Sequence, residues 1–265
     1  MAEAEDVITD AARHLTEFSQ TLWRKHRPRN EISFVMLADL ARDIELLITA
    51  VFGSPYRIRA SQAPAPPTLL ARLFRPQPHT GQRHSLPATD GVCIWLPVHA
   101  GTSDMALGRQ RYRVAALQQA VRSQRGSVLL LPQADQGTAD FYLLLESFAA
   151  DRDLVRLLPG MAPQIAAARL AALKERPAQS SLSVAPRQVE QLVQAMLRAE
   201  INPVKTVWPV CETPGESLHE ALRLNGQLLE IHGVLGEHRG RYVPLFKDWW
   251  TGELRPPEPP PRPLT

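Results

Sequence analysis

Three carboxylates lie close together in one predicted helix and are the best candidates for chemistry. Glu146, Asp151 and Asp153 fall within the run FYLLLESFAADRDLVRLLPG, in which apolar residues recur with helical spacing. Paired carboxylates can share a proton or hold a hard metal ion, as a metal-dependent hydrolase would need. The same acids can instead be neutralised by arginines in a salt-bridge network between helices.

We favour the structural role for these acids, because arginines are plentiful around them. Arg152 and Arg156 lie among the acids, and Arg113 lies on the preceding predicted helix. The first contact to look for is Arg111 or Arg113 reaching Glu146. We place it at the edge of the core, since a buried ion pair is costly unless it is fully hydrogen-bonded.

Other patterns that support catalysis are absent from the sequence. None of the eight histidines has the spacing of a zinc-protease motif, and no G-x-S-x-G nucleophile turn is present. A phosphate-binding G-x-x-x-x-G-K-[ST] loop is also missing, so the chain is not itself an ATPase. We therefore expect a protein that is not an enzyme, with no catalytic residue, metal or cofactor.

Composition indicates a soluble globular protein. The 265 residues are 44% hydrophobic and 22% charged, with a formal net charge of +3. The excess arginines are scattered, so charge alone does not indicate nucleic acid, although an Arg-rich helix keeps a helical nucleic-acid-binding protein as an alternative. The acidic N-terminus, two distant cysteines and no apolar run of ~20 residues predict a cytoplasmic protein without a membrane span.

The elements that must position the acids are two central helices within residues 109–160. Gly126 should end the first helix, Thr138 or Asp140 should cap the second, and Pro159-Gly160 should end it. The two helices are expected to pack together, with Tyr112 and Phe148 in contact with a shared core. The Trp249-Trp250 pair is also expected to pack in the core rather than to anchor a partner.

The rest of the chain predicts a mainly α fold: an irregular multi-helix bundle with a small two-stranded β element. Strands at 92–97 and 128–132 should form that element. We expect one helical adaptor domain over residues 1–250, containing a Pro-rich loop at 54–87, and a Pro-rich linker at 251–265. The further predicted helices are 3–25 and 31–52, packed as a hairpin, 68–74, 161–176, 186–201 and 216–232.

Three phrases of the sequence, taken in order, resemble a known family. They are DGVCIWLP at 90–97, RYRVAALQQA at 111–120 and FYLLLESFAADRDLVRLLPGM at 141–161. They are similar to the N-terminal helical region of the VWA-containing partners of MoxR-type AAA+ ATPases. These partners are the nitric-oxide-reductase activation proteins (NorD) and the Rubisco-activation proteins (CbbO). The resemblance covers roughly residues 30–165.

The resemblance implies a non-catalytic adaptor that docks on a MoxR-type ATPase hexamer and couples this motor to a client enzyme complex. The client would be Rubisco or nitric oxide reductase, reached through a VWA domain. The metal-binding D-x-S-x-S run of that domain is absent here, so the resemblance implies that the chain is the N-terminal part of such a protein or a relative that lost the other half. The candidate docking residues are Arg109, Arg111, Arg122 and Arg125, and the Pro-rich loop at 54–87 is the alternative docking surface. The candidate structural salt bridge comprises Arg113, Glu146, Asp151 and Asp153.

Overall fold

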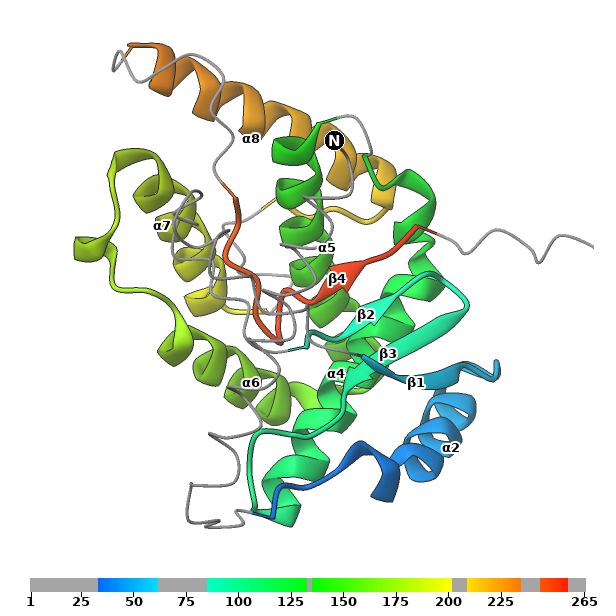
Figure 1. Ribbon diagram of the computed structural model, residues 1–265. Coiled ribbons are helices and arrows are strands. Elements are labelled where there is room, and N and C mark those ends of the chain that lie inside the picture. The colour runs from blue at the N-terminus through cyan, green and yellow to red at the C-terminus, as the bar shows by residue number, and fades with distance from the viewer. Residues whose placement is uncertain (1–32, 62–84, 133–134, 202–208, 235–243, 257–265) are drawn as a thin grey trace, which may run out of the picture. The chain divides into compact units, whose positions relative to one another are not determined.

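The computed structural model describes residues 33–61, 85–132, 135–201, 209–234 and 244–256. In these residues the chain is mainly helical with a small four-stranded mixed sheet (Figure 1). The predicted helices at 3–25 and 68–74 lie outside the described residues. No helix among those described is long and apolar enough to cross a membrane.

The helices and strands follow one another in this order along the chain. The helical elements are η1 (Leu37–Asp39), α2 (Ala41–Phe52), α4 (Met105–Arg125), η2 (Ser127–Leu130), α5 (Gln136–Leu157), η3 (Pro159–Met161), α6 (Ala162–Glu175), η4 (Gln179–Ser181), α7 (Val184–Arg198) and α8 (Pro214–Val234). The strands are β1 (Arg57–Ser61), β2 (Ala88–Thr89), β3 (Cys93–Pro97) and β4 (Glu253–Leu254).

The ends of the two central helices follow from their capping residues. The side chain of Asp104 accepts hydrogen bonds from the first turn of α4, and Gly126 ends α4 in the left-handed conformation, as predicted. The predicted cap of α5 is wrong, because Asp135 caps it instead of Thr138 or Asp140. Asp135 also accepts a hydrogen bond from the Thr138 hydroxyl, which fixes the first turn of α5.

The predicted helix at 31–52 is shorter than expected. Residues 34–37 are held outside any α-helix because their backbone bonds to the loop after β3, through Val35 N to Thr102 O and Leu37 N to Val98 O. The helix α2 starts only at Ala41. It ends at Phe52, followed by Gly53 in the left-handed conformation, as predicted. The three helices predicted in the second half of the chain are confirmed as α6, α7 and α8, with ends shifted by one to three residues.

The sheet differs from the predicted two-stranded element. Its strand order is β1-β3-β2-β4, with β1 parallel to β3, β2 antiparallel to β3, and β4 parallel to β2. The segment predicted to pair with residues 92–97, at 128–132, instead forms the helical turn η2 between α4 and α5. This prediction was wrong because Gly126 and the short link to α5 turn the chain back on itself, which leaves Leu129 exposed.

Two apolar clusters flank the central helix pair. The first packs one face of the sheet, through Ile94 and Leu96, against α2 and α4. The second joins α5 to α7 and α8. Tyr112 and Phe148 are both buried, but Tyr112 belongs to the first cluster and Phe148 to the second. The expectation that they share one core was wrong, because α5 contributes to both clusters and Phe148 lies in the second, while Ala150 and Leu154 lie in the first with Tyr112.

Residues 244–256, which we call the C-terminal strap, pack into the centre of the fold. Trp250, Thr251 and Gly252 are buried, and β4 pairs with β2 (Figure 1). Trp250 is buried, as predicted for the tryptophan pair, whereas Trp249 is half-buried and packs against the first apolar cluster. The boundary expected between residues 250 and 251 therefore falls inside packed structure, because the backbone at 251–254 bonds to buried groups before the Pro-rich sequence begins.

Two helical glycines should respond to alanine in opposite ways. A Cβ on Gly108 would lie 2.7 Å from the Cβ of Val35, whereas a Cβ on Gly226 would meet nothing within 4 Å. We expect Gly108→Ala to destabilise the protein by ~1–2 kcal/mol despite its better helix propensity, because the packed core resists added atoms. Gly226→Ala should stabilise it by ~0.5–1 kcal/mol. Urea unfolding of both variants, with Val35→Ala as the partner change that relieves Gly108→Ala, measures the difference. A stabilising Gly108→Ala would contradict the close contact.

Candidate functional site

The antiparallel pairing of α4 and α5 sets which charged side chains meet. Gln118 donates to Asp151, and Arg122 Nη2 donates to Ser147 Oγ at 2.8 Å. Moving toward the end of α4 therefore means moving toward the start of α5, so Arg125 lies opposite Glu146. The predicted contact from Arg111 or Arg113 to Glu146 is wrong, because these two arginines lie near the other end of α4. Arg113 is exposed there.

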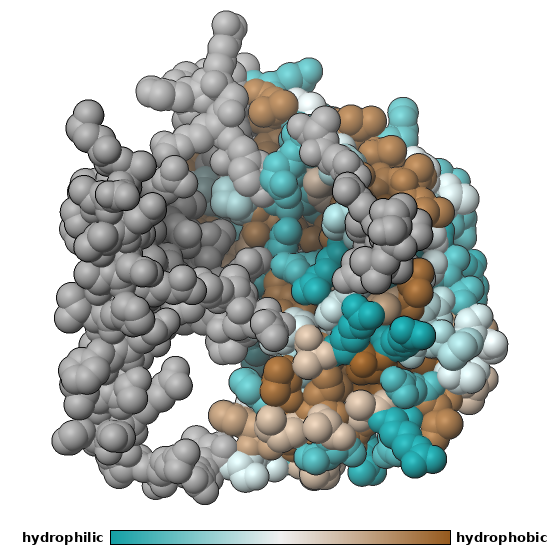
Figure 2. All heavy atoms as spheres, turned by 45° about the vertical axis from the view of Figure 1, so that its right-hand side comes forward, coloured by the Kyte–Doolittle hydropathy of each residue, from teal (hydrophilic) through white to brown (hydrophobic). Residues whose placement is uncertain are grey.

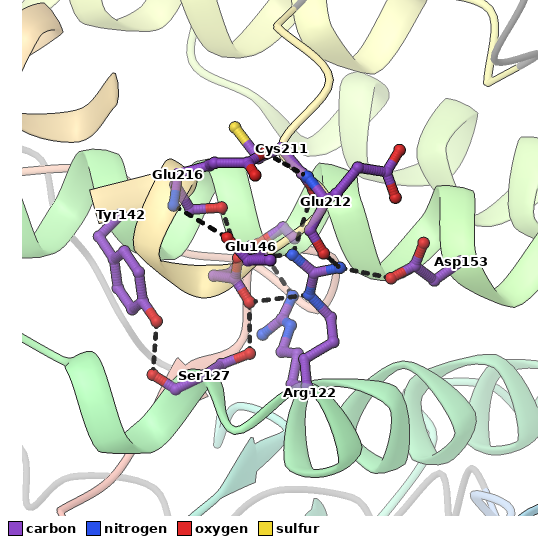
Figure 3. A network of polar contacts seen from close by, with 12 residues as sticks. Arg122, Ser127, Tyr142, Glu146, Asp153, Cys211, Glu212 and Glu216 are labelled. Carbon is purple, nitrogen blue, oxygen red and sulfur yellow. Dashed lines mark hydrogen bonds and ion pairs between the residues drawn. The ribbon is translucent and has the colours of Figure 1, made fainter. Parts of the chain in front are cut away.

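Glu146 is the hub of a buried polar network (Figure 3). Arg125 binds it with two nitrogens, Nε to Oε2 and Nη2 to Oε1, both at 3.1 Å. The hydroxyl of Ser127 donates to one carboxylate oxygen and that of Ser217, on α8, to the other at 2.5 Å. Glu146 thus joins α4, η2, α5 and α8 at one point.

The pKa shifts of Glu146 and Arg125 indicate that the Glu146 carboxylate is ionised. Burial by itself would raise the pKa of Glu146, but the hydrogen bonds and charge of Arg125, with the two serine hydroxyls, bring that pKa below its usual value. Burial likewise acts to lower the pKa of Arg125, and Glu146 and Asp153 reverse this and raise it. Both groups therefore stay charged at neutral pH.

Asp153 lies at the solvent-facing side of the same network. It pairs with Arg125 and, at 2.6 Å, with Arg156 Nη2. Glu212 extends the network, with Oε1 3.3 Å from Arg152 Nη2 and Oε2 3.4 Å from Arg156 Nη1. The prediction that arginines neutralise Glu146 and Asp153 is confirmed, but the partner on α4 is Arg125 and not Arg113.

Asp151 belongs to a second buried group, separate from Glu146. Its Oδ1 accepts from Gln118, its Oδ2 accepts from Trp250 Nε1 at 2.7 Å, and Arg169 Nε lies 3.7 Å from Oδ2. Burial raises the pKa of Asp151, and the positive charges of Arg169 and Arg122 with the indole and amide donors offset only part of this effect. The sequence places Asp151 beside Asp153, but the helix turns their side chains to different surroundings.

The candidate docking arginines divide into two pairs. Arg109 is exposed and Arg111 is half-buried, whereas Arg122 is fully buried and the side chain of Arg125 is only 6% exposed. Burial lowers the pKa of Arg122 to about 10, even with Asp151, Glu146 and Asp248 nearby. Arg122 and Arg125 cannot share a partner-facing surface with Arg109, because their guanidinium groups face α5 and the strap.

The strap is held by groups that sequence reasoning missed. Arg122 donates to Thr251 O at 2.8 Å and to Trp250 O at 3.1 Å. Arg176 donates to Phe246 O at 2.7 Å and pairs with both Asp248 and Glu190. The Asp248-Trp-Trp-Thr run offered one local signal, since Asp248 accepts the backbone N–H groups of Trp250 and Thr251 as in an Asx turn.

The three candidate carboxylates all take part in bonds that link elements of the fold. The oxygens of Glu146, Asp151 and Asp153 are bonded to guanidinium, hydroxyl, amide or indole donors, and Glu146 and Asp151 are fully buried. Among the residues that the structure describes, no group of three His, Cys, Asp or Glu side chains could hold a metal ion.

The two buried acids should give amide variants with opposite pH dependence. Glu146 has a lowered pKa, so its contribution to stability is present above the unfolded-state pKa and is lost as pH falls through the folded value. Asp151 has a raised pKa, so its contribution is present below the unfolded-state pKa and is lost as pH rises through the folded value. We expect Glu146→Gln to cost most at neutral pH and Asp151→Asn to cost most in acid. Urea midpoints from about pH 3 to pH 8 measure both, and parallel profiles would contradict the assignment.

Comparison with known proteins adds no further information about this site. No protein-family model, no curated protein and no solved structure gives a significant match to the chain.

Proposed function

We propose that this chain is a non-catalytic helical adaptor that docks on a MoxR-type AAA+ ATPase and couples it to a client enzyme complex. Rubisco and nitric oxide reductase are the two clients that the sequence resemblance suggests. The ATPase supplies the force, and this domain supplies a rigid attachment.

One observation carries the proposal: the three phrases that resemble the family bond to one another. Tyr112, in the second phrase, donates its hydroxyl to Pro97 O of the first at 2.9 Å. Gln118, also in the second, donates to Asp151 of the third. Residues that are buried and in mutual contact specify a fold, so their order and spacing support a shared helical scaffold rather than a shared active site.

The docking surface that we propose is the first half of α4. Arg109 and Arg113 are exposed there, together with Met105, which is 50% exposed, and Leu107, which is 40% exposed. Arginines and exposed apolar side chains together are typical of protein-binding surfaces. Figure 2 shows the molecule from the side of α2 and the sheet, where apolar and polar residues are interleaved.

A pull-down with the cognate MoxR-type ATPase tests the proposal. We expect a complex at micromolar concentration that the double variant Arg109→Glu/Arg113→Glu weakens at least tenfold. Lys174→Glu, an exposed charge reversal on α6, is the matched control and should bind normally. Absence of a complex with the unaltered chain, both with and without nucleotide, would reject the adaptor role. Equal loss in the control would reject the surface.

The two alternative functions have less support. A hydrolase built on Glu146, Asp151 and Asp153 would need accessible carboxylate oxygens, and these oxygens are bonded to donors inside the fold. A nucleic-acid-binding helix would need its arginines on one exposed face, and Arg122 and Arg125 are turned inward.

A further inference from the structure

A cavity of about 410 Å³ lies between α4, α6, the loop after β3 and the strap. Its volume is in the range of small-molecule sites. The walls are mainly apolar, with Leu86, Val98, Ala168, Ala171 and Trp249 among the lining residues. None of the acids in the Glu146 network lines it, so the cavity is separate from that structural network.

The floor of the cavity is fixed by the buried Asp151 group. Gln118 and Trp250 both line the cavity, and both donate to Asp151, which does not line it. Each of these two side chains is 2% exposed. A floor held by such bonds is preorganised, because neither side chain must reorient when a ligand enters.

One cation at this cavity has spare hydrogen-bonding capacity. Arg111 donates Nη1 to Ala100 O at 3.0 Å, which orients the guanidinium, and its other N–H groups have no partner among the residues that the structure describes. Lys247 also lines the cavity, but its ammonium is paired with Asp140, with Nζ 3.5 Å from Oδ1. Asp248 also lines the cavity, but its charge is matched by Arg176 at 3.0 Å. Glu175 is the remaining lining carboxylate and is exposed.

We propose that this cavity binds a carboxylate attached to an apolar body. The carboxylate pairs with Arg111, and the apolar body lies along Ala168, Ala171 and Trp249. Arginine recognises carboxylates through paired N–H donors, and the apolar walls accept the rest of the molecule. Such a carboxylate can come from a free organic acid or from the C-terminus of a protein chain. This proposal does not depend on the adaptor role.

Titration with 3-phenylpropionate, followed by the intrinsic tryptophan fluorescence to which Trp249 and Trp250 in the cavity wall contribute, tests the site. We expect a dissociation constant on the order of 1 mM for this small probe. The neutral amide 3-phenylpropanamide should bind at least tenfold more weakly. Binding of acid and amide with equal affinity would overturn the proposal, as would no binding up to about 20 mM by either this acid or the peptide acid described below.

Variants test whether the acid binds in this cavity or is attracted nonspecifically to the positively charged protein. Arg111→Gln should weaken the acid about tenfold, while Lys174→Gln, at an exposed residue of α6 that does not line the cavity, should leave binding unchanged. Ala171→Phe adds a bulky side chain to the cavity wall and leaves Arg111 in place, and it should abolish binding in a protein whose circular dichroism is unchanged. If Lys174→Gln acts like Arg111→Gln, or if Ala171→Phe binds normally in a folded protein, the assignment is wrong.

A second titration distinguishes the source of the carboxylate. An N-acetylated pentapeptide ending in leucine is compared, as acid and as amide, with 3-phenylpropionate. Tighter binding by the peptide acid assigns the site to a protein C-terminus, and tighter binding by 3-phenylpropionate assigns it to a free acid. Binding by neither would overturn the proposal.

Discussion

Replacing Glu146 by alanine is expected to cost ~3–5 kcal/mol of unfolding free energy, which is a large share of the stability of a domain. The change leaves Arg125 as an uncompensated charge whose side chain is 6% exposed. It also removes the acceptor from the hydroxyls of Ser127 and Ser217. Urea unfolding at neutral pH measures the loss.

Two further variants test why Glu146→Ala is destabilising. Glu212→Ala removes a carboxylate that is 51% exposed and should cost less than ~1 kcal/mol. Arg125→Met/Glu146→Leu replaces both buried charges with apolar groups and should be more stable than Glu146→Ala. A double variant as unstable as the single variant would show that the lost acceptor of Ser127 and Ser217, and not the unpaired arginine, sets the cost.

Replacing Arg122 by methionine is expected to loosen the strap and to cost ~2–5 kcal/mol, because buried acceptors lose their donor. Methionine keeps an unbranched apolar stem but cannot donate to Trp250 O, Thr251 O or Ser147 Oγ. Hydrogen exchange reports on the strap through the amides of Glu253 and Arg255, which bond to Pro87 O and Thr89 O at 2.8 Å. Relative to the unaltered protein, we expect Arg122→Met to accelerate the exchange of these two amides more than the exchange of amides in the middle of α4.

The control for this experiment is Arg156→Met, at a side chain that is 59% exposed and bonds only at the rim of the Glu146 network. It should change stability by less than ~1 kcal/mol and leave strap exchange unchanged. If Arg122→Met speeds exchange equally throughout the fold, Arg122 supports the whole core and does not specifically hold the strap.

Local sequence determined the helices of this protein. The capping signal at Gly126, the Pro-Gly end of α5 and the apolar spacing in α6, α7 and α8 each act within a few residues, so they can be read without the fold. The mainly helical class and the neutralisation of Glu146 and Asp153 by arginines follow from the same local information.

Tertiary structure decided which residues meet. The choice of Arg125 over Arg113 as the partner of Glu146 depends on the register of α4 against α5, and that register is fixed by contacts between residues far apart in the sequence. The fourth strand and the cavity depend on the return of the strap to the sheet. Composition predicted a Pro-rich linker at the end of the chain. It could not predict that residues 244–256 pack in the core, because long-range hydrogen bonds from Arg122 and Arg176 hold them there.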